Sequence, residues 1–210
     1  MAYVVREIFP TLQGEGAQAG LPMVFVRFAG CNLWSGREPD RARDAERTGA
    51  SCPLWCDTDF VSGDRLTAPV LVERVKAHVG PRWICFTGGE PSLQLDRPLL
   101  EATRAAGYRA AIETNGTRRL DEIADLLDWI CVSPKLPVPA VTRGHELKVV
   151  YSGQPETELR ALETLAFEHL SLQPEWGPRY PTHLAAALDF LRRQPRWRLS
   201  LQTHKILGLP

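Results

Sequence analysis

The chain has 210 residues, enough for one domain with a substantial core and too few for two comfortable ones. Its 25 basic and 25 acidic residues cancel, which argues against a general binder of nucleic acid or of anionic membranes. Apolar residues make up 44% and charged residues 24%, a globular balance that excludes a disordered chain. Without a signal segment or an apolar run near the ~18 residues that span a bilayer, we expect a cytoplasmic protein with five reduced cysteines.

Short apolar segments alternate with helical patterns, which predicts βα units around a mainly parallel sheet. Strands are expected at residues 4–8, 23–28, 83–86, 108–112, 129–132, 146–150, 169–172 and 197–201. Seven or eight strands with fewer helices fall short of a complete (β/α)8 barrel, which takes ~250 residues. We therefore expect a partial, open (β/α) barrel in one domain, residues 1–210. Its open edge favours a homodimer.

Four helices are expected between these strands. Thr67 is placed to cap the first and Asp96 the second, which ends at Gly107. Pro155 and Pro181 mark the first turns of the other two. The inward-facing positions of these last two helices are expected to be Leu159, Leu162, Leu165, Leu184, Leu188 and Leu191.

Residues 32–60 interrupt the alternation. Within them, residues 36–51 hold eight charged residues of sixteen, a composition typical of a solvated loop or a short exposed helix. We interpret residues 36–51 as a charged insertion. A loop this long in a compact domain is usually functional.

Polar and glycine-rich motifs lie at the carboxyl ends of most expected strands. They are Ala29-Gly30-Cys31, Thr87-Gly88-Gly89-Glu90-Pro91, Glu113-Thr114-Asn115-Gly116, Ser133-Pro134-Lys135, Gln173-Pro174 and Gln202-Thr203-His204-Lys205. Any single motif of this kind usually marks a turn. In parallel α/β folds, however, the carboxyl ends of the strands share one face, and that face carries the site. Several such motifs on one face therefore indicate an enzyme.

Three of the five cysteines, Cys31, Cys52 and Cys56, lie in one loop, whereas Cys85 and Cys131 lie in apolar strands where inert thiols are expected. Clustered thiols in a cytosolic protein indicate a metal. A structural zinc site requires a fourth Cys or His, and no His lies between residues 1 and 77. Three thiolates suit an iron–sulfur cluster with one iron free of protein ligands. The cysteines alone favour zinc and iron–sulfur about equally.

Cys31 with its downstream pair, followed in the next βα unit by the Thr87–Pro91 motif, resembles the radical S-adenosylmethionine (SAM) superfamily. Within it, the chain resembles the 7-carboxy-7-deazaguanine synthase family of queuosine and 7-deazapurine biosynthesis. The matching segments, from residue 7 to the last residues, are FPTLQGEG (9–16), RFAGCNLW (27–34), CDT (56–58), ETNG (113–116), SPK (133–135), ELK (146–148) and QTHK (202–205). The cysteine spacing, C-x20-C-x3-C, departs from the usual C-x3-C-x2-C. The charged insertion accounts for the first gap.

The resemblance implies a partial barrel of the radical SAM type, with a long cluster-binding loop after the first barrel strand. It implies a [4Fe-4S] cluster on Cys31, Cys52 and Cys56, SAM on the open iron, and an electron donor such as flavodoxin or ferredoxin. A 5′-deoxyadenosyl radical would abstract hydrogen from C6 of 6-carboxy-5,6,7,8-tetrahydropterin. Ring contraction and loss of ammonia would then give 7-carboxy-7-deazaguanine. Thr58 resembles the family's Mg²⁺ ligand.

The resemblance also assigns positions around the two small molecules. Those around SAM are Gly88, Gly89, Glu90, Ser133, Pro134, Lys135, Gln173, Pro174, Glu175 and Trp176. Those around the substrate are Leu12, Gln13, Gly14, Arg27, Thr87, Glu113, His204 and Pro210, with Glu113 and Gln13 as catalytic groups.

Three of these positions carry an expectation from local chemistry as well. Arg27, on an otherwise apolar strand, offers a bidentate fork for a carboxylate, although an ion pair at a strand end is the structural alternative. Gln202 and His204 are expected to share one side of a strand extension. The terminal carboxylate at Pro210 is expected to accept hydrogen bonds from pterin N–H groups.

Two other functions stay open. One is a radical SAM activase that installs a glycyl radical on a partner protein, which would use the same cluster but gives Arg27 and Gln13 no pterin to bind. The other is a non-catalytic zinc-binding module. A brown protein with roughly four irons per chain after anaerobic reconstitution would exclude zinc.

Overall fold

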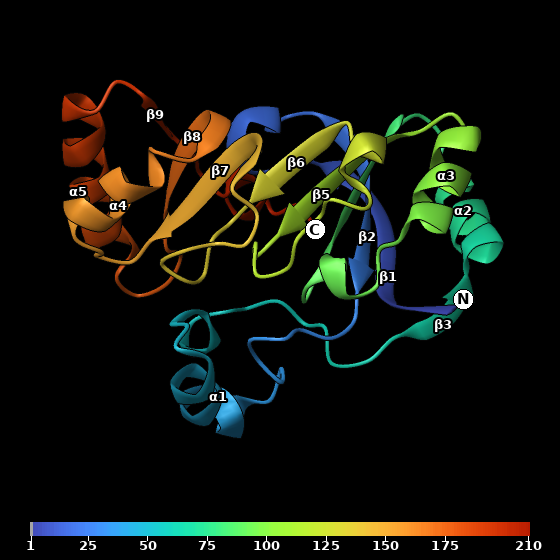
Figure 1. The fold of residues 1–210 in the computed structure, drawn as a ribbon, viewed down its shortest axis with the longest axis horizontal. Coiled ribbons are helices and arrows are strands. Elements are labelled where there is room, and N and C mark those ends of the chain that lie inside the picture. The colour runs from blue at the N-terminus through green and yellow to red at the C-terminus, as the bar shows by residue number, and fades with distance from the viewer. Residues whose placement is uncertain (1) are drawn as a thin grey trace.

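The computed structural model describes residues 2–210, which form one open sheet of nine strands (Figure 1). In chain order the elements are β1 (Ala2–Leu12), β2 (Pro22–Phe28), α1 (Arg41–Thr48), β3 (Asp64–Thr67), α2 (Ala68–Lys76), β4 (Trp83–Gly88), α3 (Arg97–Ala105), β5 (Arg109–Thr114), β6 (Trp129–Val132), β7 (Arg143–Tyr151), α4 (Glu156–Leu162), β8 (Ala166–Pro174), α5 (Tyr180–Arg193), β9 (Trp197–Leu199) and α6 (Thr203–Leu207). Short 3-10 turns connect several of them, including η3 (Cys52–Leu54).

The strand order is β3-β1-β2-β4-β5-β6-β7-β8-β9. From β2 to β9 the neighbouring strands run parallel, whereas β1 pairs antiparallel with both β2 and β3. The expected partial, open barrel is therefore confirmed, with β3 and β9 as its edges. Strand β3 was not expected from the sequence, because Leu66 is its one buried side chain. Strand β1 is longer than expected: it runs antiparallel to β2 and ends at Leu12, opposite Pro22, so that the first residues of the 9–16 motif are part of the sheet.

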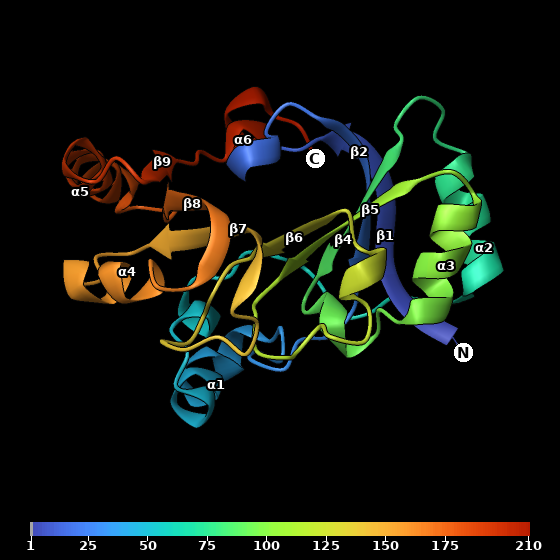
Figure 2. The same ribbon diagram turned by 45° about the horizontal axis from the view of Figure 1, so that its top comes forward.

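The expected strand extension at Gln202 and His204 is wrong. Strand β9 ends at Leu199, and α6 begins at Thr203, beside the turn between β1 and β2 (Figure 2). The backbone N–H and the hydroxyl of Thr203 both donate to the carbonyl of Gly14, at 2.9 and 2.8 Å. This tertiary contact captures the backbone that a further strand would need for its ladder.

The helix signals are largely confirmed. The carboxylate of Asp96 accepts from the N–H of Leu99 at 3.1 Å and caps α3, and Gly107 follows with φ +83°. Thr67 precedes α2, but its side chain makes no cap hydrogen bond. In α4, Leu159 and Leu162 face the core as expected.

The buried face of α5 differs from the expected one by one position. His183, Ala187 and Phe190 are buried, whereas the expected Leu184, Leu188 and Leu191 are only half-buried. The ring of Phe190 packs edge-on against Trp197 of β9, with centroids 5.9 Å apart, and this contact sets the rotation of the helix.

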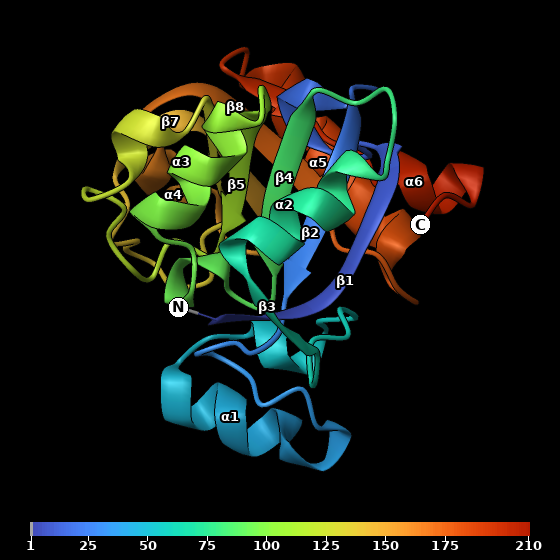
Figure 3. The same ribbon diagram turned by 90° about the vertical axis from the view of Figure 1, so that its right-hand side faces the viewer.

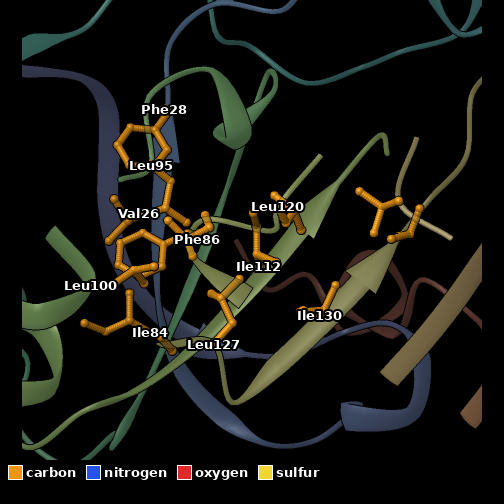
Figure 4. Packing of buried hydrophobic residues seen from close by; sticks show 14 of the residues in the cluster. Val26, Phe28, Ile84, Phe86, Leu95, Leu100, Ile112, Leu120, Leu127 and Ile130 are labelled. Atoms are coloured by element: carbon orange, nitrogen blue, oxygen red, sulfur yellow. The ribbon is translucent and has the colours of Figure 1, made fainter. Parts of the chain in front are cut away.

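The main core lies between the sheet and helices α2 to α5. Figure 4 shows Val26, Phe86 and Leu100 packed together from β2, β4 and α3. The rings of Phe28 and Phe86 stack on neighbouring strands with centroids 6.1 Å apart. Full burial of each such side chain contributes about 1.5–3 kcal/mol. The core therefore holds the parallel strands in register and aligns their carboxyl ends on one face.

The charged insertion forms helix α1, beyond the carboxyl end of β2 and apart from the sheet (Figures 1 and 3). Of the two alternatives that the composition allowed, a solvated loop and a short exposed helix, residues 41–48 form the helix. Asp44 is the buried residue of this exposed helix, and its carboxylate accepts a hydrogen bond from the N–H of Ser35 at 2.8 Å. A second small core of Leu33, Ala50 and Cys52 lies beneath the insertion, separate from the main one.

The Thr87–Pro91 motif passes very close to the chain that leads to Cys31. The N–H of Gly89 donates to the carbonyl of Phe28 at 3.2 Å, and that of Glu90 donates to Gly30 at 2.9 Å. Gly88 has φ +137°, and a Cβ built on it would lie 2.3 Å from the carbonyl oxygen of Phe28. Glycine is required there by both conformation and space.

We predict that Gly88→Ala lowers the free energy of unfolding far more than Gly80→Ala. Gly80 also has a positive φ, +117°, but a Cβ there meets nothing within 4 Å. Gly80→Ala isolates the backbone strain, about 1–3 kcal/mol, to which Gly88→Ala adds a backbone collision. Urea unfolding of the metal-free variants measures both losses. Equal losses would show that the close approach to Phe28 does not constrain the loop.

Candidate functional site

Two adjoining cavities share residues near the carboxyl ends of the parallel strands, and one of them extends along β1 as far as Leu12. We call the smaller one, about 190 Å³, the inner cavity and the larger one, about 440 Å³, the outer cavity. The side chains that line both are Glu15, Asp57, Thr58, Thr87, Glu113 and Gln202. We call these six residues the shared wall. Molecules bound in the two cavities would contact the same wall from opposite sides.

The three loop cysteines, Cys31, Cys52 and Cys56, all line the inner cavity. Cys31 accepts a hydrogen bond from the N–H of Leu33 at 3.5 Å. Burial raises the pKa of Cys31, and it raises that of Cys52 to about 12. Cys85 and Cys131, by contrast, are buried inside β4 and β6, where burial raises the pKa of each well above its usual value.

The donor set fits an iron–sulfur cluster. Three thiols surround one cavity, and a backbone N–H points at one sulfur, which is a contact that tunes such clusters. Within residues 2–210, no three His, Cys, Asp or Glu side chains converge closely enough to hold a single metal ion. A four-iron cluster takes each of its three cysteines on a different iron, so three thiols spread around one cavity suit it.

Five of the ten residues expected around SAM line the inner cavity: Gly88, Gly89, Ser133, Lys135 and Gln173. The ammonium group of Lys135 donates to the hydroxyl of Ser133 at 2.7 Å and lies 4.9 Å from the centroid of a Trp55 ring.

The other five are not among the residues that line the inner cavity. Glu90 is fully buried and accepts from the N–H groups of Ser92 and Asn115 and from the hydroxyl of Thr114. It therefore joins the Thr87–Pro91 motif to the 113–116 motif. Trp176 is 42% exposed, and Nζ of Lys205 lies 5.5 Å from the centroid of its ring. The remaining three are Pro134, Pro174 and Glu175.

All eight residues expected around the substrate line the outer cavity. They are Leu12, Gln13, Gly14, Arg27, Thr87, Glu113, His204 and Pro210. They come from β1, β2, β4, β5 and the segment around α6, so elements distant in sequence meet at one cavity. His204 packs against Gly14, where a Cβ would lie 2.2 Å from the imidazole Nδ1. Burial lowers the pKa of His204, which favours the neutral imidazole.

Arg27 makes the ion pair that was the alternative to a substrate contact. Its Nε lies 2.6 Å from Oε1 of Glu7, and its guanidinium is 5.8 Å from the centroid of the Phe9 ring. Its side chain nevertheless lines the outer cavity and is 21% exposed there. The ion pair and a place in the cavity therefore coexist.

Two residues of the shared wall, Glu15 and Glu113, belong to a buried ion triad that the sequence did not reveal. Lys148, 2% exposed on β7, donates from Nζ to Glu15 at 2.6 Å and to Glu113 at 2.9 Å. Burial alone would lower the pKa of Lys148, but the carboxylates of Glu113 and Glu15 raise it well above its usual value. Burial would likewise raise the pKa of Glu15, yet Lys148 brings it to about 2. Lys148 and Glu15 are therefore both ionised.

Two amides complete the triad. Nε2 of Gln13 donates to Oε1 of Glu113 at 2.7 Å, while its Oε1 accepts from the N–H of Glu15 at 3.0 Å. Nε2 of Gln202 donates to the other oxygen of Glu15 at 2.8 Å. The available signal for Lys148 was its place in the quoted 146–148 motif, where Lys148 and Glu146 are the two charges of an otherwise apolar expected strand. Glu15 and Gln202 lay inside the quoted motifs without an assigned role.

No family model matches the chain. Among curated proteins, it is 51% identical to the 7-carboxy-7-deazaguanine synthase of Bordetella pertussis and 48% identical to that of Bradyrhizobium diazoefficiens, in each case over all of both chains. Among solved structures, it is similar to the crystal structure of QueE from Escherichia coli. That match has a TM-score of 0.72 and 25% identity, and it covers 97% of this chain and 95% of that one.

These relatives are similar over their whole length and share one name, and the solved structure shares the open sheet. The chain belongs to the 7-carboxy-7-deazaguanine synthase family.

Proposed function

We propose that this chain is a radical SAM enzyme, a lyase that converts 6-carboxy-5,6,7,8-tetrahydropterin into 7-carboxy-7-deazaguanine with loss of ammonia. The observation that carries this proposal is the pair of adjoining cavities, one lined by three cysteines and the other by polar side chains, with a shared wall. The curated relatives bear the name of this product, an intermediate of queuosine biosynthesis. Membership of that family favours neither of the two alternatives, a glycyl-radical activase and a zinc-binding module.

We propose that Cys31, Cys52 and Cys56 hold a [4Fe-4S] cluster in the inner cavity and that SAM binds there beside it. Cluster and SAM together supply the hydrogen-abstracting radical chemistry. Gly88 and Gly89 let backbone approach SAM closely, and Ser133, Lys135 and Gln173 provide polar contacts from three further strand ends. We propose indirect roles for the flanking residues that shape these strand ends: Glu90, Pro134, Pro174, Glu175 and Trp176.

The pterin substrate is proposed to occupy the outer cavity. Arg27 would meet its carboxylate, because a guanidinium forms two parallel hydrogen bonds with a carboxylate. Gln13 and Glu113, as catalytic groups, would orient the pterin edge, since the amide and carboxylate offer both donors and acceptors. Leu12, Gly14, Thr87, His204 and Pro210 would complete the contacts. Thr58, on the shared wall, is placed to offer a hydroxyl to Mg²⁺ beside substrate oxygens.

Lys148 fixes the two carboxylates that face both cavities. Because its ammonium group pairs with Glu15 and Glu113 at the same time, neither carboxylate is free to rotate away from the shared wall. The low local dielectric strengthens these contacts and the hydrogen bonds that the carboxylates make to a ligand. The triad is thus a preorganised acceptor surface for the N–H groups of the substrate.

Partners and location extend this proposal. The cluster chemistry requires an electron donor, for which a flavodoxin or a ferredoxin is suited by potential. All five cysteines are free, as in a cytoplasmic protein, and within residues 2–210 we find no helix of the length and apolarity that crossing a membrane requires. A homodimer would cover an edge of the open sheet.

Anaerobic reconstitution tests the proposal. The unaltered protein should bind roughly four irons per chain and form 7-carboxy-7-deazaguanine, detected by mass spectrometry. Cys52→Ala should lose the cluster and all SAM cleavage, because the cluster needs three thiolates. The matched control Cys131→Ala, a buried thiol outside the cavity, should lose only stability. An active four-iron cluster in Cys52→Ala would contradict the assignment.

Replacement of Arg27 by Ala should weaken substrate binding by ~2–5 kcal/mol, the range for a charge-assisted pair in a desolvated site. SAM cleavage without substrate should be unchanged, because Arg27 lines only the outer cavity. Glu7→Gln serves as the control: it removes the anion now paired with Arg27 and should not weaken binding. If Arg27→Ala lost coupled and uncoupled cleavage to the same extent, Arg27 would have no role in substrate recognition.

The triad also predicts how stability depends on pH. The pKa of Glu15 lies at about 2 in the folded protein, against 4.5 ordinarily. Its ionised form therefore stabilises the fold above pH 4.5, and this contribution is lost as the pH falls towards 2. The advantage of the unaltered protein over Glu15→Gln in urea unfolding should shrink between about pH 7 and about pH 3.5. A constant difference would mean that Glu15 is not held ionised by Lys148.

A further inference from the structure

The second cysteine gap, C-x3-C, is absorbed by one turn of helix. Within the Cys52–Cys56 segment, the N–H of Trp55 donates to the carbonyl of Cys52 at 3.2 Å, and that of Cys56 donates to the same carbonyl at 2.9 Å. Residues four apart in a helical turn lie on one face, as residues three apart do. The extra residue therefore leaves both thiols facing the inner cavity, and Leu54 points outward, 57% exposed.

A single helical turn is not stable by itself. Nucleating one turn costs more than its hydrogen bonds return, and its last carbonyls have no partner within the turn. In this segment those groups include the carbonyls of Pro53 and Cys56. The turn needs an external donor to these oxygens if the two thiols are to keep their spacing.

Arg41, from the charged insertion, supplies that donor. Its Nη1 donates to the carbonyl of Pro53, and its Nη2 donates to the carbonyl of Cys56 at 2.9 Å. The guanidinium is fixed by two hydrogen bonds to Glu38, at 2.6 and 2.7 Å. One planar fork therefore spans both ends of the turn, which a lysine cannot do.

The guanidinium is also tied to the core. It stacks 4.1 Å from the centroid of a Trp34 ring, and Trp34 packs edge-on against Phe60 at 5.4 Å. The carbonyl of Phe60 accepts from the N–H of Gly30, the residue before Cys31. The contacts of Arg41 thus connect the Cys52–Cys56 turn with the segment that carries the first cysteine.

We propose that Arg41 is a positioning residue for the iron–sulfur cluster: its guanidinium holds the Cys52–Cys56 turn closed, so that the longer cysteine spacing still presents both thiols to one cluster. The inference rests on the proposed function for the identity of the cluster. The geometry of the turn, however, is a property of the metal-free chain. The insertion is thereby a structural support for the cluster loop.

Alkylation of the metal-free protein tests the turn directly. In Arg41→Ala, the rate at which iodoacetamide labels Cys52 should rise about tenfold or more, because loss of the clamp opens the turn locally. The labelling of Cys131, buried in β6, should stay at its original rate and reports global unfolding. The control Arg47→Ala removes an equal charge from the same helix. That side chain is 58% exposed and its ion pair is with Asp44, at 3.6 Å, away from the carbonyls of the cysteine turn, so its loss should change neither rate.

Reconstitution provides the second readout. Iron and sulfide per chain should fall in Arg41→Ala, and the electron paramagnetic resonance spectrum of the remaining cluster should change. Arg41→Lys keeps the charge over Trp34 but cannot reach both carbonyls, so it should show the same effects to a smaller degree.

Each outcome decides the matter. Original Cys52 labelling and iron content in Arg41→Ala overturn the proposal. If that variant unfolds, so that Cys131 is also labelled, Arg41→Lys decides: raised Cys52 labelling supports the clamp, and unchanged labelling overturns it. An unaltered protein that binds no iron would contradict the proposed function instead, while the labelling experiment would still test Arg41.

Discussion

The site depends on the two ion pairs that the buried ammonium group of Lys148 makes with Glu15 and Glu113. The ammonium group connects three parts of the chain: Glu15 in the turn after β1, Glu113 at the end of β5, and its own strand β7. Removing one partner of such a buried pair typically costs about 3–5 kcal/mol, because the other charge is left uncompensated. The triad therefore holds the β1–β2 turn, and with it Gln13 and Gly14, against β5 and β7.

On the two sides of the shared wall, the cavities are lined by chemically different groups. The outer one gathers carboxylates, amides and a guanidinium, which suits a polar, planar substrate with an acid group. The inner one gathers thiols and strand-end backbone, kept close by the contacts between the Thr87–Pro91 motif and Gly30. Because the wall is shared, a hydrogen-abstracting group bound in one cavity would lie next to a substrate bound in the other. Proximity of this kind is what such chemistry needs from a protein.

Much of this arrangement could be predicted from the sequence. The alternation of strands and helices fixes a parallel sheet, and its geometry brings the polar motifs to one face. The three loop cysteines and the residues expected around the substrate do line the two cavities. The roles assigned to them remain proposals.

What the sequence did not predict depends on contacts between distant residues. Lys148 gains its importance from partners 133 and 35 residues away, which no local pattern encodes. The strand expected through His204 is replaced by α6 because Gly14 captures the backbone of Thr203. Arg41 is one charge among eight in a solvated composition, and only the fold shows that its guanidinium faces the cysteine turn. Composition reports the average environment of a segment and misses the exception within it.

We expect the triad, through Glu15 and Glu113 on the shared wall, to couple the chemistry of the two cavities. The most direct test of this coupling is the amount of 5′-deoxyadenosine released per 7-carboxy-7-deazaguanine formed by Lys148→Met, with cluster content matched to the unaltered protein. Without the ammonium group the carboxylates lose their fixed orientation, so we expect this ratio to rise about tenfold or more, a size typical of misplaced substrate. An unchanged ratio, with product formed at the original rate, would contradict this coupling.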